Sequence, residues 1–191
     1  MSEPVSNLEL RLKRAGKELV ATIRKRLYEA ALTAEAEGKR NATTTLHART
    51  GRLRASIASR VEAGPGDALD LKLRAGGGNN GPDVPYAAIH EYGGIIRPVR
   101  RKWLAIPLPI ARTAAGVSRY QTPRDVPGLR FMLSKRGNAL LVDKKGVPWY
   151  VLKKSVTIPK RPYLLPALLK AGDRLQKQLM RDVPDILAGS P

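Results

Sequence analysis

The chain contains no cysteine among its 191 residues. This absence excludes disulfide bonds, thiolate metal sites and a cysteine nucleophile, and it is typical of proteins that assemble in a reducing cytoplasm. Histidine is scarce as well, with His47 and His90 as the two in the chain. Aromatic residues make up 5% of the sequence and include a single phenylalanine. The core is therefore expected to consist mainly of leucine, isoleucine, valine and alanine.

Long apolar runs are also missing. No segment approaches the roughly 20 apolar residues that a helix needs to cross a bilayer. The start Met1-Ser2-Glu3-Pro4 lacks the basic and then apolar pattern of a secretory signal. We therefore expect a soluble protein made in the cytoplasm. Hydrophobic residues still make up 42% of the chain, which is enough to bury a core and argues against general disorder.

Acidic residues are scarce relative to basic ones. The chain has 35 Lys and Arg against 16 Asp and Glu, a formal net charge of +19. A field of this sign attracts polyanions and increases their encounter rate, so nucleic acid is the first partner to consider. The simpler alternative is a solvated basic surface without a particular partner.

The sequence carries no recognisable motif for catalysis or metal binding. The glycine-rich segment 76–81 lacks the lysine and the Ser or Thr of a phosphate-binding loop, and a flexible loop explains it. His90 and Glu91 are neighbours, and on a strand their side chains would point to opposite faces, so they are not expected to share a metal. A metal-free ribonuclease that uses His90, Glu91 and Arg97 is the enzymatic alternative. We expect no enzyme activity, no catalytic residues, no metal and no cofactor.

The spacing of apolar residues predicts a long helix at each end of the chain. Over 5–38 they recur every three or four positions, and at Gly38 the helix either stops or resumes through 39–47. A second amphipathic helix is expected over 163–183, with Pro166 in its first turn and Pro184 at its end.

Between these helices the sequence predicts short strands. Residues 57–63 and 68–75 flank a glycine and proline turn, and the second alternates leucine with charged residues, which is typical of an antiparallel hairpin. Residues 103–110 carry two prolines and are expected at a sheet edge. A long loop is expected over 111–130, followed by strands at 131–133, 139–143 and 149–156. The order predicts an α+β fold, with an antiparallel β-sheet packed against a long N-terminal helix and a C-terminal helix, and a long basic loop insertion.

Three short segments, taken in order, resemble a family of tailed-phage proteins. They are the TGRL segment (49–57, RTGRLRASI), the HEYGG segment (86–94, YAAIHEYGG) and the RPYL segment (158–168, IPKRPYLLPAL). Together they are similar to the tail-completion or neck proteins of siphophages, also described as head–tail connector or minor tail proteins. The second and third are also similar to virion morphogenesis proteins of Mu-like phages. The matching positions are Thr50, Gly51, Arg52, Leu53, Tyr86, Glu91, Tyr92, Gly93, Gly94, Arg161, Pro162, Tyr163, Leu164 and Pro166.

The resemblance implies one neck domain over 1–191 that assembles into a homo-oligomeric ring, with a hexamer favoured and a dodecamer as the alternative. Its parts would be a helical arm at 1–47, a core at 48–96 and 149–183, and a loop-rich basic insertion at 97–148, which shorter relatives lack. The ring would lie at the head–tail junction of the virion, assembled in the bacterial host cytoplasm. Its partners would be the head-completion or connector protein, the tail-terminator or tail-tube protein, and the backbone of the passing genomic DNA. No membrane partner is expected.

The residues of the three segments suit structural roles. Thr50 and Gly51 suit a cap and a turn that lead from a helix into the sheet. Gly93 and Gly94 permit a positive φ where a strand leaves the sheet. Packing anchors are expected at the tyrosines of these segments, Tyr86, Tyr92 and Tyr163.

Basic residues of the insertion are candidates for contacts with DNA or with neighbouring rings. Lysines and arginines that line a lumen contact phosphates without reading bases, and the alternative is that they dock onto acidic protein surfaces. The candidates cluster in loops and turns and are Arg97, Arg100, Arg101, Lys102, Lys135, Arg136, Lys144 and Lys145. The alternative function is that of a non-sequence-specific nucleic-acid-binding protein of cellular origin, which would leave the three segments unexplained.

Overall fold

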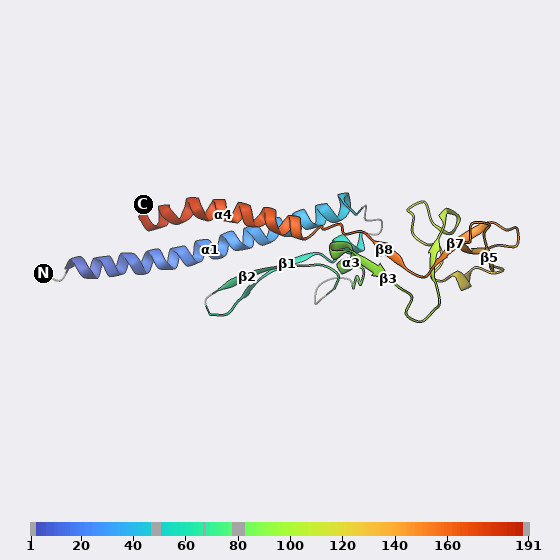
Figure 1. The fold of residues 1–191 in the computed structure, drawn as a ribbon. Helices are drawn as coiled ribbons and strands as arrows, with labels where there is room; N and C mark the ends of the chain where they lie inside the picture. The colour runs from blue at the N-terminus through green and yellow to red at the C-terminus, as the bar shows by residue number, and fades with distance from the viewer. Residues whose placement is uncertain (1–2, 47–50, 67, 78–82, 189–191) are drawn as a thin grey trace. The chain divides into compact units, whose positions relative to one another are not determined.

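The protein divides into two compact units in the computed structural model (Figure 1). Unit 1 comprises Met1–Glu91 and Arg161–Pro191, and unit 2 comprises Tyr92–Lys160. The insertion expected at 97–148 falls within unit 2, and the assignment of one neck domain to the whole chain stays a prediction. The residues that the structure describes are 3–46, 51–66, 68–77 and 83–188.

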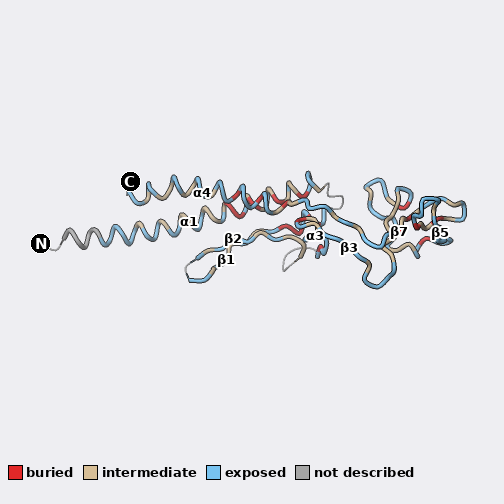
Figure 2. Tube along the Cα trace, in the orientation of Figure 1, coloured by how far each residue is buried: buried red, intermediate tan, exposed pale blue. Residues whose placement is uncertain are grey.

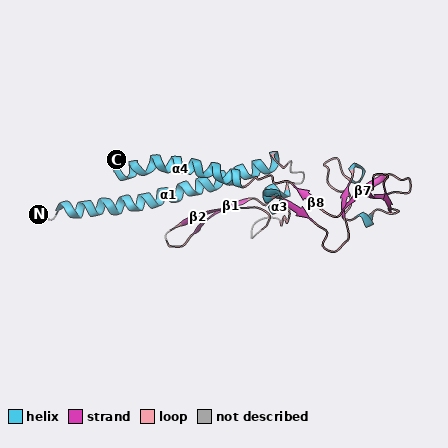
Figure 3. Cartoon of the chain, in the orientation of Figure 1, coloured by secondary structure: helices cyan, strands magenta, loops and turns pink. Residues whose placement is uncertain are grey.

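Two helices lie side by side in unit 1, α1 (Glu3–Thr44) and α4 (Leu165–Ala188) (Figures 1 and 3). Their pairing, together with the antiparallel strands, confirms the α+β class. Figure 2 shows, in red, the buried stretches of both helices. The buried apolar residues there are alanines, whose small side chains let two helices approach closely. Within the described residues, neither helix is long and apolar enough to cross a membrane. The buried alanines are Ala30, Ala31, Ala34, Ala42, Ala167 and Ala171.

One of the two alternatives left open at Gly38 is confirmed, and the expected end of the second long helix is wrong. α1 continues through Gly38 to Thr44, and Gly38 lies against the chain that follows, since a Cβ there would be 3.4 Å from Cγ2 of Ile57. α4 continues through Pro184 to Ala188. A proline removes one backbone hydrogen bond, and here it does so close to the end of the helix. Just before it, Arg26 Nε of α1 donates to Asp182 Oδ2 at 2.6 Å and holds this turn in place.

A hairpin of β1 (Ala58–Ala63) and β2 (Leu69–Arg74) lies against α1 in unit 1. Its antiparallel pairing, from Ala58 opposite Arg74 to Ala63 opposite Leu69, confirms the hairpin expected from the alternating sequence. The Glu35 carboxylate of α1 accepts hydrogen bonds from Ser59 N at 2.8 Å and Ser59 Oγ at 2.9 Å. Burial opposes its ionisation, but bonds from Lys39 and Ser59 outweigh it and lower the pKa of Glu35.

Two short helices complete unit 1. α2 (Arg52–Ala55) forms the turn that leads into β1, as the sequence predicts. The HEYGG segment forms α3 (Ala87–Tyr92), so the strand expected around His90 and Glu91 is wrong. Ala87 N donates to Val84 O at 3.0 Å in the first turn, and α3 ends at Tyr92, just before Gly93, whose φ is 72°.

Unit 2 contains two small antiparallel sheets. β3 (Gly94–Ile96) pairs with β8 (Val156–Ile158). The second sheet has the order β4-β7-β6-β5. Its strands are β4 (Leu104–Pro107), β5 (Arg130–Leu133), β6 (Ala139–Val142) and β7 (Pro148–Lys153).

The strand predictions for unit 2 are largely confirmed. β4 carries Pro107 and lies at the edge of its sheet, as expected. The strand expected at 149–156 is divided, because β7 ends at Lys153 and the chain enters the other sheet at Val156. The strand expected at 103–110 ends at Pro107 and is followed by the short 3-10 helix η1 (Pro109–Ala111). The expected long loop holds a second one, η2 (Pro123–Asp125), and its apolar residues pack against the larger sheet. The residues of this second core are Ala111, Val126 and Tyr150, packed with Ala105, Tyr120, Leu129, Leu141 and Trp149.

Gly76→Ala is expected to destabilise the protein by about 2 kcal/mol or more. Gly76 has a φ of 97°, and a Cβ there would lie 2.6 Å from Ala87 Cβ and 2.9 Å from Val84 O, so strain and a clash add together. The measurement is the free energy of unfolding in urea. The control is Gly66→Ala, where φ is 66° and nothing lies within 4 Å of the added Cβ. This control should lose about 1 kcal/mol, and an equal loss in both variants would contradict the close contact.

Candidate functional site

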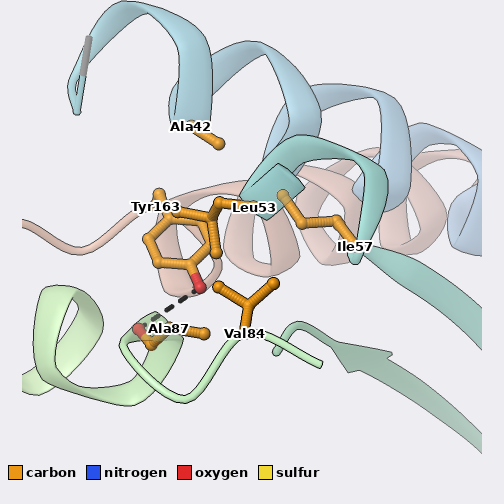
Figure 4. Close-up of a cluster of buried hydrophobic side chains, with 6 residues drawn as sticks. All are labelled: Ala42, Leu53, Ile57, Val84, Ala87 and Tyr163. Atoms are coloured by element: carbon orange, nitrogen blue, oxygen red, sulfur yellow. Dashed lines mark hydrogen bonds between the residues drawn. The ribbon is translucent and has the colours of Figure 1, made fainter. Parts of the chain in front are cut away.

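The three motif segments meet in the core of unit 1 (Figure 4). The TGRL segment supplies Leu53 and Ile57, the HEYGG segment supplies Ala87, and the RPYL segment supplies Tyr163. These side chains are at most 4% exposed and pack with Ala42 of α1 and with Val84. Three stretches that lie far apart in the sequence therefore form one buried cluster.

Glu91 of α3 binds the beginning of α4. Its Oε2 accepts the backbone N–H groups of Tyr163 at 2.8 Å and Leu164 at 3.0 Å, and its Oε1 accepts that of Leu165 at 3.0 Å. Backbone N–H groups at the start of a helix have no partner inside it, and a negative charge there also interacts favourably with the helix dipole. Glu91 is 6% exposed, so water competes little for these bonds. A side chain from a distant segment thus serves as the N-terminal cap of α4.

Further hydrogen bonds hold the same junction. Tyr163 Oη donates to Ala87 O at 3.4 Å, and Asn41 Nδ2 of α1 donates to Tyr163 O at 3.0 Å. The backbone N–H of Arg161 donates to His90 O at 2.9 Å. The RPYL segment is therefore tied to both α1 and α3 before α4 begins.

The expected packing anchors turn out differently. Tyr163 is fully buried, so this prediction is confirmed. Tyr92 is 75% exposed, so it is not an anchor within this chain. The reason is that the turn of α3 directs Glu91 inward, and its neighbour on a helix faces another side. Tyr86 is 40% exposed and meets the His90 ring edge-on, with centroids 5.9 Å apart.

Other residues of the segments serve as caps and turns. Gly51 takes the N-cap position of α2 with a φ of 69°, while Thr50 lies outside the described residues. Gly93 and Gly94 have positive φ values of 72° and 155° as expected, although they join α3 to β3 instead of ending a strand. Arg52 is exposed, Pro162 is half-buried, and Pro166 lies in the first turn of α4.

The residues of the ribonuclease alternative do not form a catalytic group. The Glu91 carboxylate is buried and engaged by three backbone amides, so it is not free to act as a base. Burial, together with the positive charge of Arg161, lowers the pKa of His90. In the described part of the chain no three His, Cys, Asp or Glu residues gather as a metal site would require. The expectations of no enzyme activity and no cofactor stay predictions.

The excess of positive charge is concentrated in unit 2. Residues 92–160 contain fifteen Lys and Arg against two acidic residues, a formal net charge of +13 out of the +19 of the chain. Ion pairs such as Arg26–Asp182 and Lys170–Glu37 occur in unit 1. Within residues 92–160, all of which are described, the structure records no ion pair. No carboxylate of unit 2 therefore pairs with its cations, although Lys154 Nζ lies over the Trp103 ring, 5.9 Å from its centroid, and Arg119 Nε donates to Arg112 O at 2.7 Å.

Both acidic residues of unit 2 hold local turns. Asp143 accepts hydrogen bonds from Val147 N and Lys145 N, each at 2.9 Å, and from Trp149 Nε1 at 3.3 Å. The Val147 amide, with Trp149 and Lys145, holds the pKa of Asp143 below its ordinary value. Asp125 accepts from Thr122 N at 2.7 Å in a capping box of η2. Neither carboxylate neutralises a side-chain cation by direct contact.

A groove with an apolar floor and a basic rim lies on unit 2. It has a volume of about 880 Å³ and is lined by residues 98–105, 121–124 and 126–129 with Leu141 and Leu152. We call it the Trp103 groove. The floor is apolar, with Trp103, Leu129 and Leu141 half-buried and Leu152 buried. No acidic residue lines it, and the exposed cations of its rim are Arg100, Arg101, Lys102 and Arg124.

The basic candidates from the sequence fall into separate places on unit 2. Arg100, Arg101 and Lys102 line the Trp103 groove. Lys135 and Arg136 line a second hollow of about 520 Å³, together with Lys153. The Lys144 side chain lies beside Gly128 of the Trp103 groove, because a Cβ on Gly128 would be 3.3 Å from its Cε. Arg97 and Lys145 are exposed and line neither hollow.

Sequence reasoning missed two features of these sites. Arg124 and Trp103 were not connected with the basic cluster, since only the fold brings 121–129 beside 98–105. The capping role of Glu91 was also missed. An acidic residue just before a helix is a known cap signal, but here the acidic residue is 72 positions away from Tyr163.

Comparisons of this chain with protein-family models, curated proteins and solved structures found no match.

Glu91→Ala is expected to lower the free energy of unfolding by about 2–3 kcal/mol, because three backbone N–H groups lose their acceptor. Glu91→Gln should lose less, since its amide oxygen still accepts. The measurement is urea unfolding followed by circular dichroism. Glu62→Gln is the control, because the partners of Glu62 are exposed cations of the hairpin and such pairs contribute little. A loss in Glu91→Ala no larger than in Glu62→Gln would contradict the capping role.

His90 is expected to make the protein less stable as the pH falls. Its pKa is lowered in the folded state, so around its ordinary value of 6.5 the unfolded chain binds more protons than the folded protein. The contribution of neutral His90 to the free energy of unfolding is fully present above about pH 6.5, and it is lost as the pH falls below this value. His90→Gln should therefore show a smaller decline in unfolding free energy than the native chain between about pH 7.5 and 5.5. Identical pH profiles for the two proteins would contradict this prediction.

Proposed function

We propose that this chain is a structural protein of a tailed-phage virion, and that it forms a ring at the head–tail junction which joins the connector to the tail. The observation that carries this proposal is the meeting of the TGRL, HEYGG and RPYL segments in one core. Short matches that arose by chance would have no reason to converge in space. Segments that belong to one structural module are expected to converge, because they build the same core.

The way these residues are used also supports a structural function. Leu53, Ile57 and Tyr163 pack in the core, and Glu91 caps a helix, so the segments determine the shape of unit 1. None of these four side chains presents a reactive group to solvent. In a structural protein, the residues that resemble those of the phage neck proteins would be used in this way, for packing and for capping.

Exposed apolar side chains on the two long helices support assembly with other subunits. Single exposed apolar residues are common, but several on neighbouring helices are typical of an interaction surface. A ring repeats one contact around its axis, and we propose six copies, with twelve as the alternative. The side chains that are at least half exposed are Leu10, Leu12, Val20, Tyr28, Leu32, Leu169, Met180 and Leu187.

Nucleic-acid binding is the second candidate function, and the charge of unit 2 favours it. A net charge of +13 without an internal ion pair suits a polyanion. In the ring this charge would face the passing genome or the neighbouring head-completion and tail proteins. In a cellular protein it would bind nucleic acid without base specificity.

The test is a nonsense mutation in the gene for this chain, introduced into the virus that encodes it. The particles that this mutant virus makes are then examined. We expect filled heads and finished tails to accumulate separately in negative-stain micrographs, and a plasmid copy of the gene to restore joined virions. Joined, infectious virions from the mutant without the plasmid would overturn the proposal and favour the nucleic-acid-binding alternative.

A further inference from the structure

We propose that the Trp103 groove of unit 2 is a docking site for an acidic segment of a neighbouring virion protein, anchored by apolar side chains. This inference rests on the proposed function and specifies one of its contacts. It assigns Arg100, Arg101 and Lys102 to a protein partner instead of to the DNA in the lumen.

The floor of the groove suits apolar anchors. Trp103, Leu129 and Leu141 are half-buried and open into a hollow of about 880 Å³, which is within the range of pockets that bind small ligands. Apolar side chains of a partner would remove this surface from water. Tryptophan and arginine are the residues that most often dominate the energy of protein interfaces, and both line this groove.

The rim specifies the charge of the occupant. Arg100, Arg101 and Arg124 are exposed, and the two carboxylates of unit 2 are engaged elsewhere by Val147 N and Thr122 N. The guanidinium groups are therefore free to bind carboxylates of a partner, which they can do through two parallel hydrogen bonds. Charge complementarity of this kind selects the partner and speeds association.

A second copy of this chain is a poor occupant. It carries 35 Lys and Arg against 16 Asp and Glu, so it offers few carboxylates to this basic rim. Several of its acidic residues are engaged within their own chain, since Glu35, Glu37 and Glu62 are all in ion pairs. The occupant is therefore expected to be a different, acidic protein.

DNA also fits the groove less well than a peptide does. Contacts to the phosphate backbone come from charged and polar groups and need no apolar floor. Single-stranded DNA would stack on aromatic side chains, but Trp103 is the one aromatic residue among the lining residues and is half-buried. Lys135 and Arg136 of the second hollow stand apart from this groove and remain candidates for DNA contact.

Complementation of the nonsense mutant with charge-reversal variants tests the proposal. The groove variant is Arg100→Glu/Arg101→Glu, and the matched control is Lys135→Glu/Arg136→Glu, which changes the net charge equally on exposed residues outside the groove. We expect the groove variant to restore about 100-fold fewer infectious particles than the native gene and to be missing from purified particles. The control should be incorporated, and its titre should lie within about tenfold of the native gene. Equal thermal unfolding of the purified variants shows that both are folded.

The other results of this experiment each overturn the inference. If the groove variant is incorporated but titre falls, the rim acts on DNA or on a later step. If both variant proteins are equally absent from purified particles, incorporation depends on the total charge of the protein and not on the groove. If the groove variant complements like the native gene, the docking site is wrong while the neck function stands. A mutant that needs no complementation would instead refute the proposed function itself.

A photo-crosslinking amino acid in place of Val99 identifies the occupant directly. Val99 lines the groove and is 97% exposed, so the substitution disturbs no packing. In purified virions we expect a crosslink to a peptide of another virion protein that carries several Asp or Glu beside apolar residues. Leu133, which is exposed on β5 and outside the groove, is the control position. A crosslink to DNA, to a second copy of this chain or to a segment without acidic residues would overturn the inference.

Discussion

The contact on which unit 1 depends is that between the Glu91 carboxylate and the backbone N–H groups that begin α4. Burying a carboxylate is unfavourable unless hydrogen bonds replace the water that it loses. Here three amides replace that water, and the helix dipole adds to the stabilisation. The bonds fix where α4 starts, and Tyr163, which donates one of them, fills the core between Leu53 and Ala87. One acidic side chain thus determines where a helix begins and where the buried Tyr163 lies.

The same junction explains how this fold accommodates unit 2. The chain leaves unit 1 after Glu91 and returns at Arg161, and the hydrogen bond from Arg161 N to His90 O holds these two points together. Immediately beyond them, β3 pairs with β8, with Gly94 opposite Ile158. An insertion whose ends are adjacent disturbs its host little, because the host chain continues as though the gap were short. The core of unit 1 can therefore be built by residues on both sides of a long insertion.

Several elements could be predicted from the sequence because their signals are local. The helical period of α1, the alternation in β2 and the proline that places β4 at an edge are all visible within a short window. Gly38 left two alternatives open, and Pro184 and the HEYGG segment led to wrong expectations, because tertiary contacts overrode local preference. Gly38 lies against Ile57, the α4 turn before Pro184 is held by Arg26, and α3 is fixed by the bonds of Glu91. The Trp103 groove could not be predicted at all, because it arises where 98–105 and 121–129 come together.

Charged residues serve different purposes in the two units: they pair within unit 1, whereas in unit 2 they are exposed to a partner. In unit 1 part of the charge is paired within the unit, because Glu37 binds Lys170 and Asp182 binds Arg26 across its two helices. A surface that must attract a partner benefits from charges without internal partners, because each pair made within the chain would have to be broken on binding. Unit 2 keeps such cations exposed around an apolar floor, while its two aspartates hold the turns beside it. Its loops can therefore change in sequence and charge without altering the capped helix on which unit 1 depends.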